Sequence, residues 1–105
     1  MQVTISSPRC KVPDPVLRST RAQIQKLTRY EKRLQSAVVR FDIDHGLHRV
    51  EARLTVAGAP LIVAHGTGEN FRTAVDRIID RLSRSLRRRR EQRQDVRSSP
   101  VQRSI

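Results

Sequence analysis

Residues 71–86 carry a single apolar stripe at helical spacing, and this stripe limits what the chain can fold into. Its members recur every three or four residues, which places them on one face of an α-helix. They are Phe71, Val75, Ile78, Ile79, Leu82 and Leu86. A helix with one apolar face must cover another apolar surface, such as one face of a β-sheet. The sequence therefore requires a second layer, which the preceding residues can supply.

Three segments before this helix alternate between apolar and polar residues, which predicts strands with one buried face. They span residues 37–44, 49–56 and 61–67, with turns at His45-Gly46 and Gly58-Ala59-Pro60. Strands joined by such short turns form hairpins. The segments therefore predict an antiparallel meander.

A further strand and helix are predicted near the N-terminus. Residues 2–6 alternate and are followed by Pro8, and residues 15–31 repeat apolar side chains at helical spacing. Asp14 and Pro15 together indicate a helix start, with Asp14 as the capping side chain and Pro15 at the first helical position. The predicted order is β-α-β-β-β-α. We expect an α+β fold, in which a four-stranded mixed sheet has its first two strands parallel and both helices on one face.

The chain of 105 residues is strongly basic, with a formal charge of +12 and an isoelectric point of about 11.7. Residues 72–93 hold nine arginines against three acidic residues, so much of the excess lies in the last helix and its extension. Such a concentration of positive charge indicates a polyanionic partner.

A row of arginines on the last helix is the main candidate binding site. Arg77, Arg81, Arg84 and Arg88 are spaced four, three and four residues apart, so they share one helix face, which we expect opposite the apolar stripe. Neighbouring arginines repel each other unless an anion lies between them, and their guanidinium groups can bind phosphate oxygens in pairs. The row therefore favours a structured nucleic acid. A basic run, Arg87 to Arg90, overlaps its end.

Other functions find little support. Cys10 is the single cysteine, and His45, His48 and His65 do not show the spacing of a metal site. We find no nucleophile motif and no glycine-rich phosphate loop, so we predict no enzymatic activity and no metal. The N-terminus shows no signal peptide and no apolar run could span a membrane, which favours a cytoplasmic protein. We place one domain at residues 1–90 and a flexible polar and basic tail at residues 91–105.

Five short motifs carry a resemblance to a known family. They are Met-Gln-Val-Thr-Ile at residues 1–5, Lys-Leu-Thr-Arg-Tyr at 26–30, His-Arg-Val-Glu-Ala at 48–52, Gly-Glu-Asn-Phe with Ala-Val-Asp at 68–76, and Asp-Arg-Leu-Ser-Arg-Ser-Leu at 80–86. In this order they resemble the bacterial ribosome hibernation factors, or ribosome-associated translation inhibitors, also called sigma-54 modulation proteins. The chain lacks the further C-terminal domain of long members and so looks like a short form.

The resemblance implies a function and a set of contacts. Family members bind the small ribosomal subunit in the channel between head and body, where they occlude the mRNA path and the tRNA sites in stationary phase. Basic helix faces contact its rRNA, and no cofactor is implied. The candidate RNA-binding residues are Lys26, Arg29, Arg77, Arg81, Arg84, Arg87, Arg88, Arg89 and Arg90. Among them Lys26, Arg29, Arg81, Arg84 and Arg88 match basic family positions, whereas Arg77 is included on helix geometry alone.

Two alternatives stay open. The α-β-β-β-α part of the order resembles double-stranded RNA-binding domains, so a general module for duplex RNA is the main alternative. A protein-interaction module that docks on an acidic regulator is the third possibility. The expected state away from the ribosome is a monomer.

Overall fold

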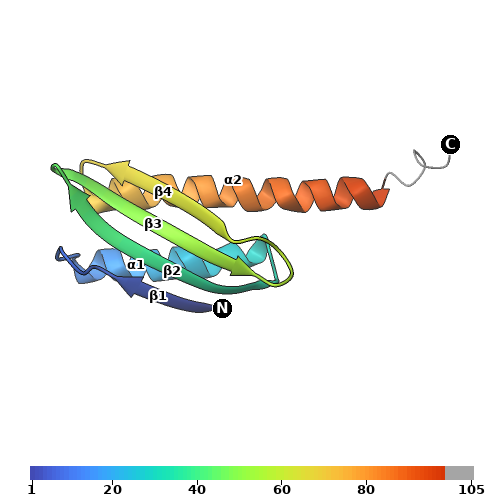
Figure 1. The fold of residues 1–105 in the computed structure, drawn as a ribbon, viewed down its shortest axis with the longest axis horizontal. Coiled ribbons are helices and arrows are strands. Elements are labelled where there is room, and N and C mark those ends of the chain that lie inside the picture. The colour runs from blue at the N-terminus through green and yellow to red at the C-terminus, as the bar shows by residue number, and fades with distance from the viewer. Residues whose placement is uncertain (99–105) are drawn as a thin grey trace.

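Within residues 1–98, a four-stranded sheet is accompanied by two α-helices and a short 3-10 helix (Figure 1). A computed structural model describes the backbone of residues 1–98 and the side chains of residues 1–92. The elements are β1 (Gln2–Ser6), α1 (Asp14–Gln25), the short 3-10 helix η1 (Lys26–Arg29), β2 (Leu34–Asp44), β3 (Leu47–Val56), β4 (Ile62–Gly68) and α2 (Phe71–Ser98). The strands lie in the order β1-β2-β3-β4, with β1 parallel to β2 and the other pairs antiparallel. The predicted α+β fold and its β-α-β-β-β-α order are confirmed.

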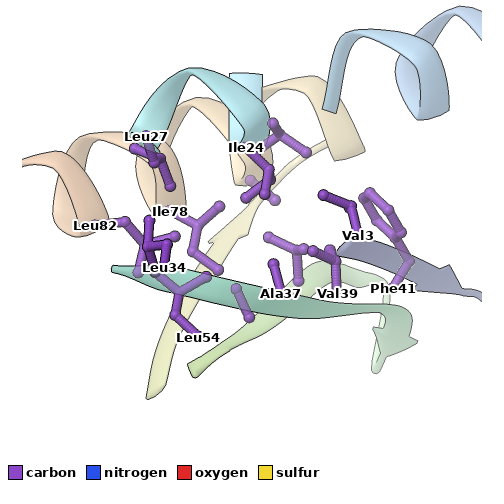
Figure 2. Close-up of a cluster of buried hydrophobic side chains, with 14 of the residues drawn as sticks. Val3, Ile24, Leu27, Leu34, Ala37, Val39, Phe41, Leu54, Ile78 and Leu82 are labelled. Atoms are coloured by element: carbon purple, nitrogen blue, oxygen red, sulfur yellow. The ribbon is translucent and has the colours of Figure 1, made fainter. Parts of the chain in front are cut away.

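The core fills the space between the sheet and the helices, which cover the same sheet face (Figure 2). Alternate residues of β2 and β3 point into it, and Ile24 and Leu27 close it from α1 and η1. The apolar stripe of α2 is buried as the spacing predicts, down to Leu86. Phe41 and Phe71 meet edge to face in this core, with ring centroids 5.3 Å apart.

The predicted hairpin turn at His45-Gly46 is present. His45 has a φ of 53° and Gly46 a φ of 79°. Positive values at both central residues give a mirror-image turn, whose twist matches that of the flanking strands. The turn fixes the register in which Asp44 faces Leu47, and with it the side chains that reach the open face of the sheet.

The start of α1 differs from the prediction. Pro13 takes the capping position, and Asp14 lies within the first turn without making a capping hydrogen bond. The main-chain oxygen of Pro13 accepts the N–H groups of Val16 and Leu17, at 2.9 and 3.1 Å. The regular α-helix also ends at Gln25, and the chain tightens into η1 over the residues predicted as its last turn.

The α2 helix packs directly on β4 because a glycine lies between them. A Cβ atom at Gly66 would collide with the main-chain oxygen of Ala74, so only glycine permits this approach. Asn70 precedes the first residue of the helix, and its Oδ1 accepts the Thr73 N–H at 2.8 Å. The helix extends well beyond the sheet, as Figure 1 shows, and is helical to Ser98. The predicted tail at residues 91–105 thus begins within helical backbone and ends outside the described residues, and the domain boundary at residue 90 stays a prediction.

Candidate nucleic-acid interface

Two members of the arginine row of α2 reach the edge of the sheet. Arg77 donates a hydrogen bond from Nη1 to the main-chain oxygen of Thr67 at 2.8 Å, and Arg81 donates one to that of His65. Both acceptors belong to β4, the last strand of the sheet. All four arginines of the row are exposed, whereas the apolar stripe is turned to the core. Arg77 and Arg81 thus reach from the exposed side of α2 to the sheet edge, a contact that the helical spacing did not predict.

These two contacts hold the guanidinium groups in place without neutralising them. Each arginine has five N–H donors, and the structure uses one of them at Arg77 and one at Arg81. Both residues remain exposed. The remaining donors are therefore available to an anion, at positions set by the strand.

Arg84 and Arg88, the other two members of the row, make no hydrogen bond to the sheet among the contacts described. Arg84 pairs with Asp80 one turn earlier, with Nη2 and Oδ2 3.1 Å apart, and both side chains are more than half exposed. This is the only ion pair of the row among the side chains described in residues 1–92. Arg88 is exposed beyond it. A surface pair of this kind contributes at most about 1 kcal/mol and competes weakly with a phosphate.

A second cationic group lies at the junction of α2 and η1. The Cζ atom of Arg87 lies 5.7 Å from the ring centroid of Tyr30, the residue that follows η1. This contact brings Arg87 close to the end of η1, which carries Lys26 and Arg29, both exposed. Tyr30 itself packs against the core. Lys26, Arg29 and Arg87 therefore form a second group near η1, in addition to the arginine row.

Two arginines of the basic run occupy different environments. Arg89 is half-buried and Arg90 is exposed. Arg89 stands at the position where the apolar stripe would continue after Leu86. The run of four arginines is therefore divided between several sides of the helix.

The open face of the sheet has a different character. Glu51 accepts hydrogen bonds from Arg53 at 3.1 Å and, across the strands, lies 2.9 Å from Nε2 of His65. Chiefly because of the Arg53 hydrogen bond, the pKa of Glu51 lies below its ordinary value. Arg40 stands opposite Glu51 on β2. The alternation of apolar and polar residues predicted a polar outer face, but it did not predict this cluster, because the cluster depends on the register of three strands.

Acidic and basic side chains balance on this face, where β2 and β3 carry three of each: Asp42, Asp44 and Glu51 against Arg40, Arg49 and Arg53. It forms a shallow depression of about 330 Å³, lined mainly by Arg40, Asp42, Arg49, Glu51, Arg53 and His65. The helical layer, in contrast, carries most of the excess positive charge. The two sides of the molecule therefore suit different neighbours, and polyanions favour the helical side.

The histidine, cysteine and acidic side chains are the other groups that could carry chemistry. Residues 1–92 contain no group of three histidine, cysteine or acidic side chains placed to hold a metal ion. Cys10 is half-buried, and desolvation raises the pKa of its thiol. His48 packs edge to face on Phe71, with ring centroids 4.6 Å apart. No helix within residues 1–98 has the length and apolar character that a membrane span needs.

The fold and its cationic helical layer define a class of small, basic α+β proteins. A family model described as "Sigma 54 modulation protein / S30EA ribosomal protein" matches residues 3–94, and the chain belongs to this family. The resemblance seen in the five motifs is thereby confirmed. A curated relative, the ribosome hibernation promoting factor of Azotobacter vinelandii, is 32% identical over 91 residues, which cover 87% of this chain and 84% of the relative.

Two solved structures share the fold. The N-terminal domain of Protein Y from Thermus thermophilus superimposes with a TM-score of 0.73 at 20% identity, covering 84% of this chain and 98% of that domain. A ribosomal subunit interface protein from Coxiella burnetii gives a TM-score of 0.71 at 19% identity, covering 87% of this chain and 99% of that protein. At these identities the likeness is one of fold.

Proposed function

We propose that this protein is a ribosome hibernation factor of the cytoplasm, which binds rRNA of the small ribosomal subunit and inhibits translation under stress or in stationary phase. The observation that carries the proposal is the arginine row of α2, which is held at fixed spacing in a chain that belongs to this family. The curated relative is named for ribosome hibernation. The protein acts by occupancy, and no chemical step is required.

The distribution of charge supports rRNA as the surface that is bound. The helical layer presents the arginine row (Arg77, Arg81, Arg84 and Arg88) and the η1 group (Lys26, Arg29 and Arg87). Arginine suits this task because its planar group binds phosphate oxygens in pairs and stacks on exposed bases. The described aromatic residues are largely occupied in the core, so stacking of a single strand on an aromatic platform contributes little.

The proposed mechanism depends on how firmly α2 is held and on where the protein binds the subunit. Leu82 and Leu86 anchor α2 in the core, so the helix backbone that carries the row is fixed relative to the sheet. The folded body then fills the channel between the head and body of the small subunit, where mRNA and tRNA would otherwise bind. Translation stops because mRNA and tRNA cannot enter the space that the protein fills.

Co-sedimentation with purified small subunits tests the proposal. The double variant Arg84→Gln and Arg88→Gln removes two charges from the row and leaves the contacts of Arg77 and Arg81 with β4 intact. We expect binding to fall by at least about tenfold, since each lost phosphate contact also removes counterion release. The matched control, Arg40→Gln with Arg53→Gln, removes the same charge from the open sheet face and should bind nearly as the wild type does.

Two results would count against the proposal. Equal losses in both double variants would show that net charge alone governs binding. Equal affinity of the wild type for small subunits and for arbitrary duplex RNA would instead favour a general RNA-binding module. A survey of gradient fractions from stationary-phase and growing cells tests the stress component, because the protein should sediment with ribosomal particles mainly in the former.

A further inference from the structure

Both edges of the sheet receive hydrogen bonds from the side chains of the neighbouring helix. At β4 the acceptors are the main-chain oxygens of Thr67 and His65, and the donors are Arg77 and Arg81. At β1, on the other edge, Arg21 donates to the oxygen of Val3 at 2.8 Å and Gln25 to that of Met1 at 3.0 Å. Each helix therefore supplies a pair of donors four residues apart to acceptors two residues apart on a strand.

This spacing has a geometric reason. Four residues advance a helix by about 6 Å, and two residues advance a strand by about 6.6 Å. Successive donors on a helix that runs antiparallel to an edge strand can therefore reach successive outward carbonyls. Arg77 reaches Thr67 and Arg81 the earlier His65, as this arrangement requires.

The edge strands need such cover because their own sequences offer little protection. Natural edge strands are commonly guarded by charged residues or proline within the strand. Here β1 reads Gln-Val-Thr-Ile-Ser and β4 reads Ile-Val-Ala-His-Gly-Thr-Gly, with no lysine, arginine, acidic residue or proline in either. The six charged residues of the sheet all lie in β2 and β3.

The β4 edge is the more exposed to unwanted pairing. It is seven residues long against five for β1. Large apolar side chains also lie at its outer surface: Val63 is 45% exposed and Leu61, just before the strand, is 52% exposed. An uncharged, partly apolar edge of this length is a ready partner for an identical strand from a second copy of the chain.

We propose that Arg77 and Arg81 close the β4 edge against pairing with β4 of a second copy. Their guanidinium groups occupy the carbonyl oxygens that the N–H groups of an added strand would need. They also place two positive charges at the edge, so two identical edges repel each other. This role is independent of RNA and gives these two arginines a function that Arg84 and Arg88 do not share.

The test compares two double variants of the full chain, freed of nucleic acid. Arg77→Ala with Arg81→Ala opens the edge, and Arg84→Ala with Arg88→Ala removes the same charge from the same row without touching β4. Sedimentation equilibrium over a range of concentrations measures self-association. We expect the edge variant to dimerise at a concentration roughly tenfold or more below that at which the control does so, because acceptors are freed and repulsion is removed.

Amide hydrogen exchange shows whether the contact is at the edge. In an edge dimer the outward amides of His65 and Thr67 should become protected as concentration rises, while those of β2 and β3 stay unchanged. Self-association equal to that of the control, or dimers without protection at these two amides, would overturn the proposal. If the double variant does not fold, each single alanine variant should show a smaller shift in the same direction, and two single variants that behave as the control would equally overturn it.

Discussion

The four arginines of the row are chemically equivalent in the sequence but not in the structure. Arg77 and Arg81 are fixed on main-chain oxygens of β4, Arg84 pairs with Asp80, and Arg88 lies exposed beyond them. The first pair contributes to the integrity of the sheet edge as well as to charge. A substitution at Arg77 or Arg81 therefore changes two properties at once, and Arg84 and Arg88 are better probes of binding.

Glu51 provides a prediction at the scale of a single carboxylate. Arg53, His65 and the opposing Arg40 face it, and its pKa is lowered chiefly by the Arg53 hydrogen bond. A lowered pKa means that the carboxylate stabilises the fold above its unfolded pKa of about 4.3, and that this contribution is lost as the pH falls through the folded value. In Glu51→Gln this contribution is absent at every pH.

Urea denaturation at several pH values measures the effect. Between pH 6 and pH 3 the free energy of unfolding of the wild type should fall further than that of Glu51→Gln, by about 1 kcal/mol or less, since the cluster lies at the surface. Parallel curves for the two proteins would contradict a stabilising role of the ionised carboxylate.

At the scale of elements, the contact between α2 and β4 depends on Gly66. A methyl group there meets the main chain of α2 at Ala74 and the side chain of Ile78. Because main-chain atoms cannot turn aside, Gly66→Ala should lower the free energy of unfolding by about 1–3 kcal/mol. Thr67→Ala, one residue further on, leaves the main-chain contacts unchanged. It should change the free energy of unfolding by less than about 0.5 kcal/mol. Chemical denaturation of both variants checks this, and equal effects would mean that the helix can shift away from β4.

Hydrophobic periodicity predicted the elements well because each has one buried face. The stripe from Phe71 to Leu86 and the alternation in β2 and β3 lie in the core as expected. The exact ends of the first helix were harder to predict. Pro13 caps α1 in place of Asp14, and the chain tightens into η1 after Gln25, since such details depend on the packing around each helix end.

The sequence indicated which residues belong to the candidate site, but it indicated less about how their side chains are arranged in space. Helical spacing assigned four arginines of α2 to one face, but the contacts of Arg77 and Arg81 with β4 depend on how closely the helix packs on that strand. The closeness of Arg87 to Tyr30 also depends on tertiary packing. No sequence pattern marks a guanidinium group that will bind a main-chain oxygen ten or sixteen residues away.

For the whole molecule, the central feature is the contrast between its two faces. The helical layer carries the excess arginines, whereas acidic and basic side chains balance on the open sheet face. A protein built in this way should approach a polyanion with its helices, and its orientation should be fixed by the charge difference between the layers.

Cryo-electron microscopy of purified small subunits saturated with the full chain would reveal the binding orientation directly. We predict density for the protein in the channel between head and body, with the α2 row and the η1 group against rRNA phosphates. Density at another position on the subunit, or an orientation with the open sheet face on the rRNA and the helices turned away, would contradict this prediction.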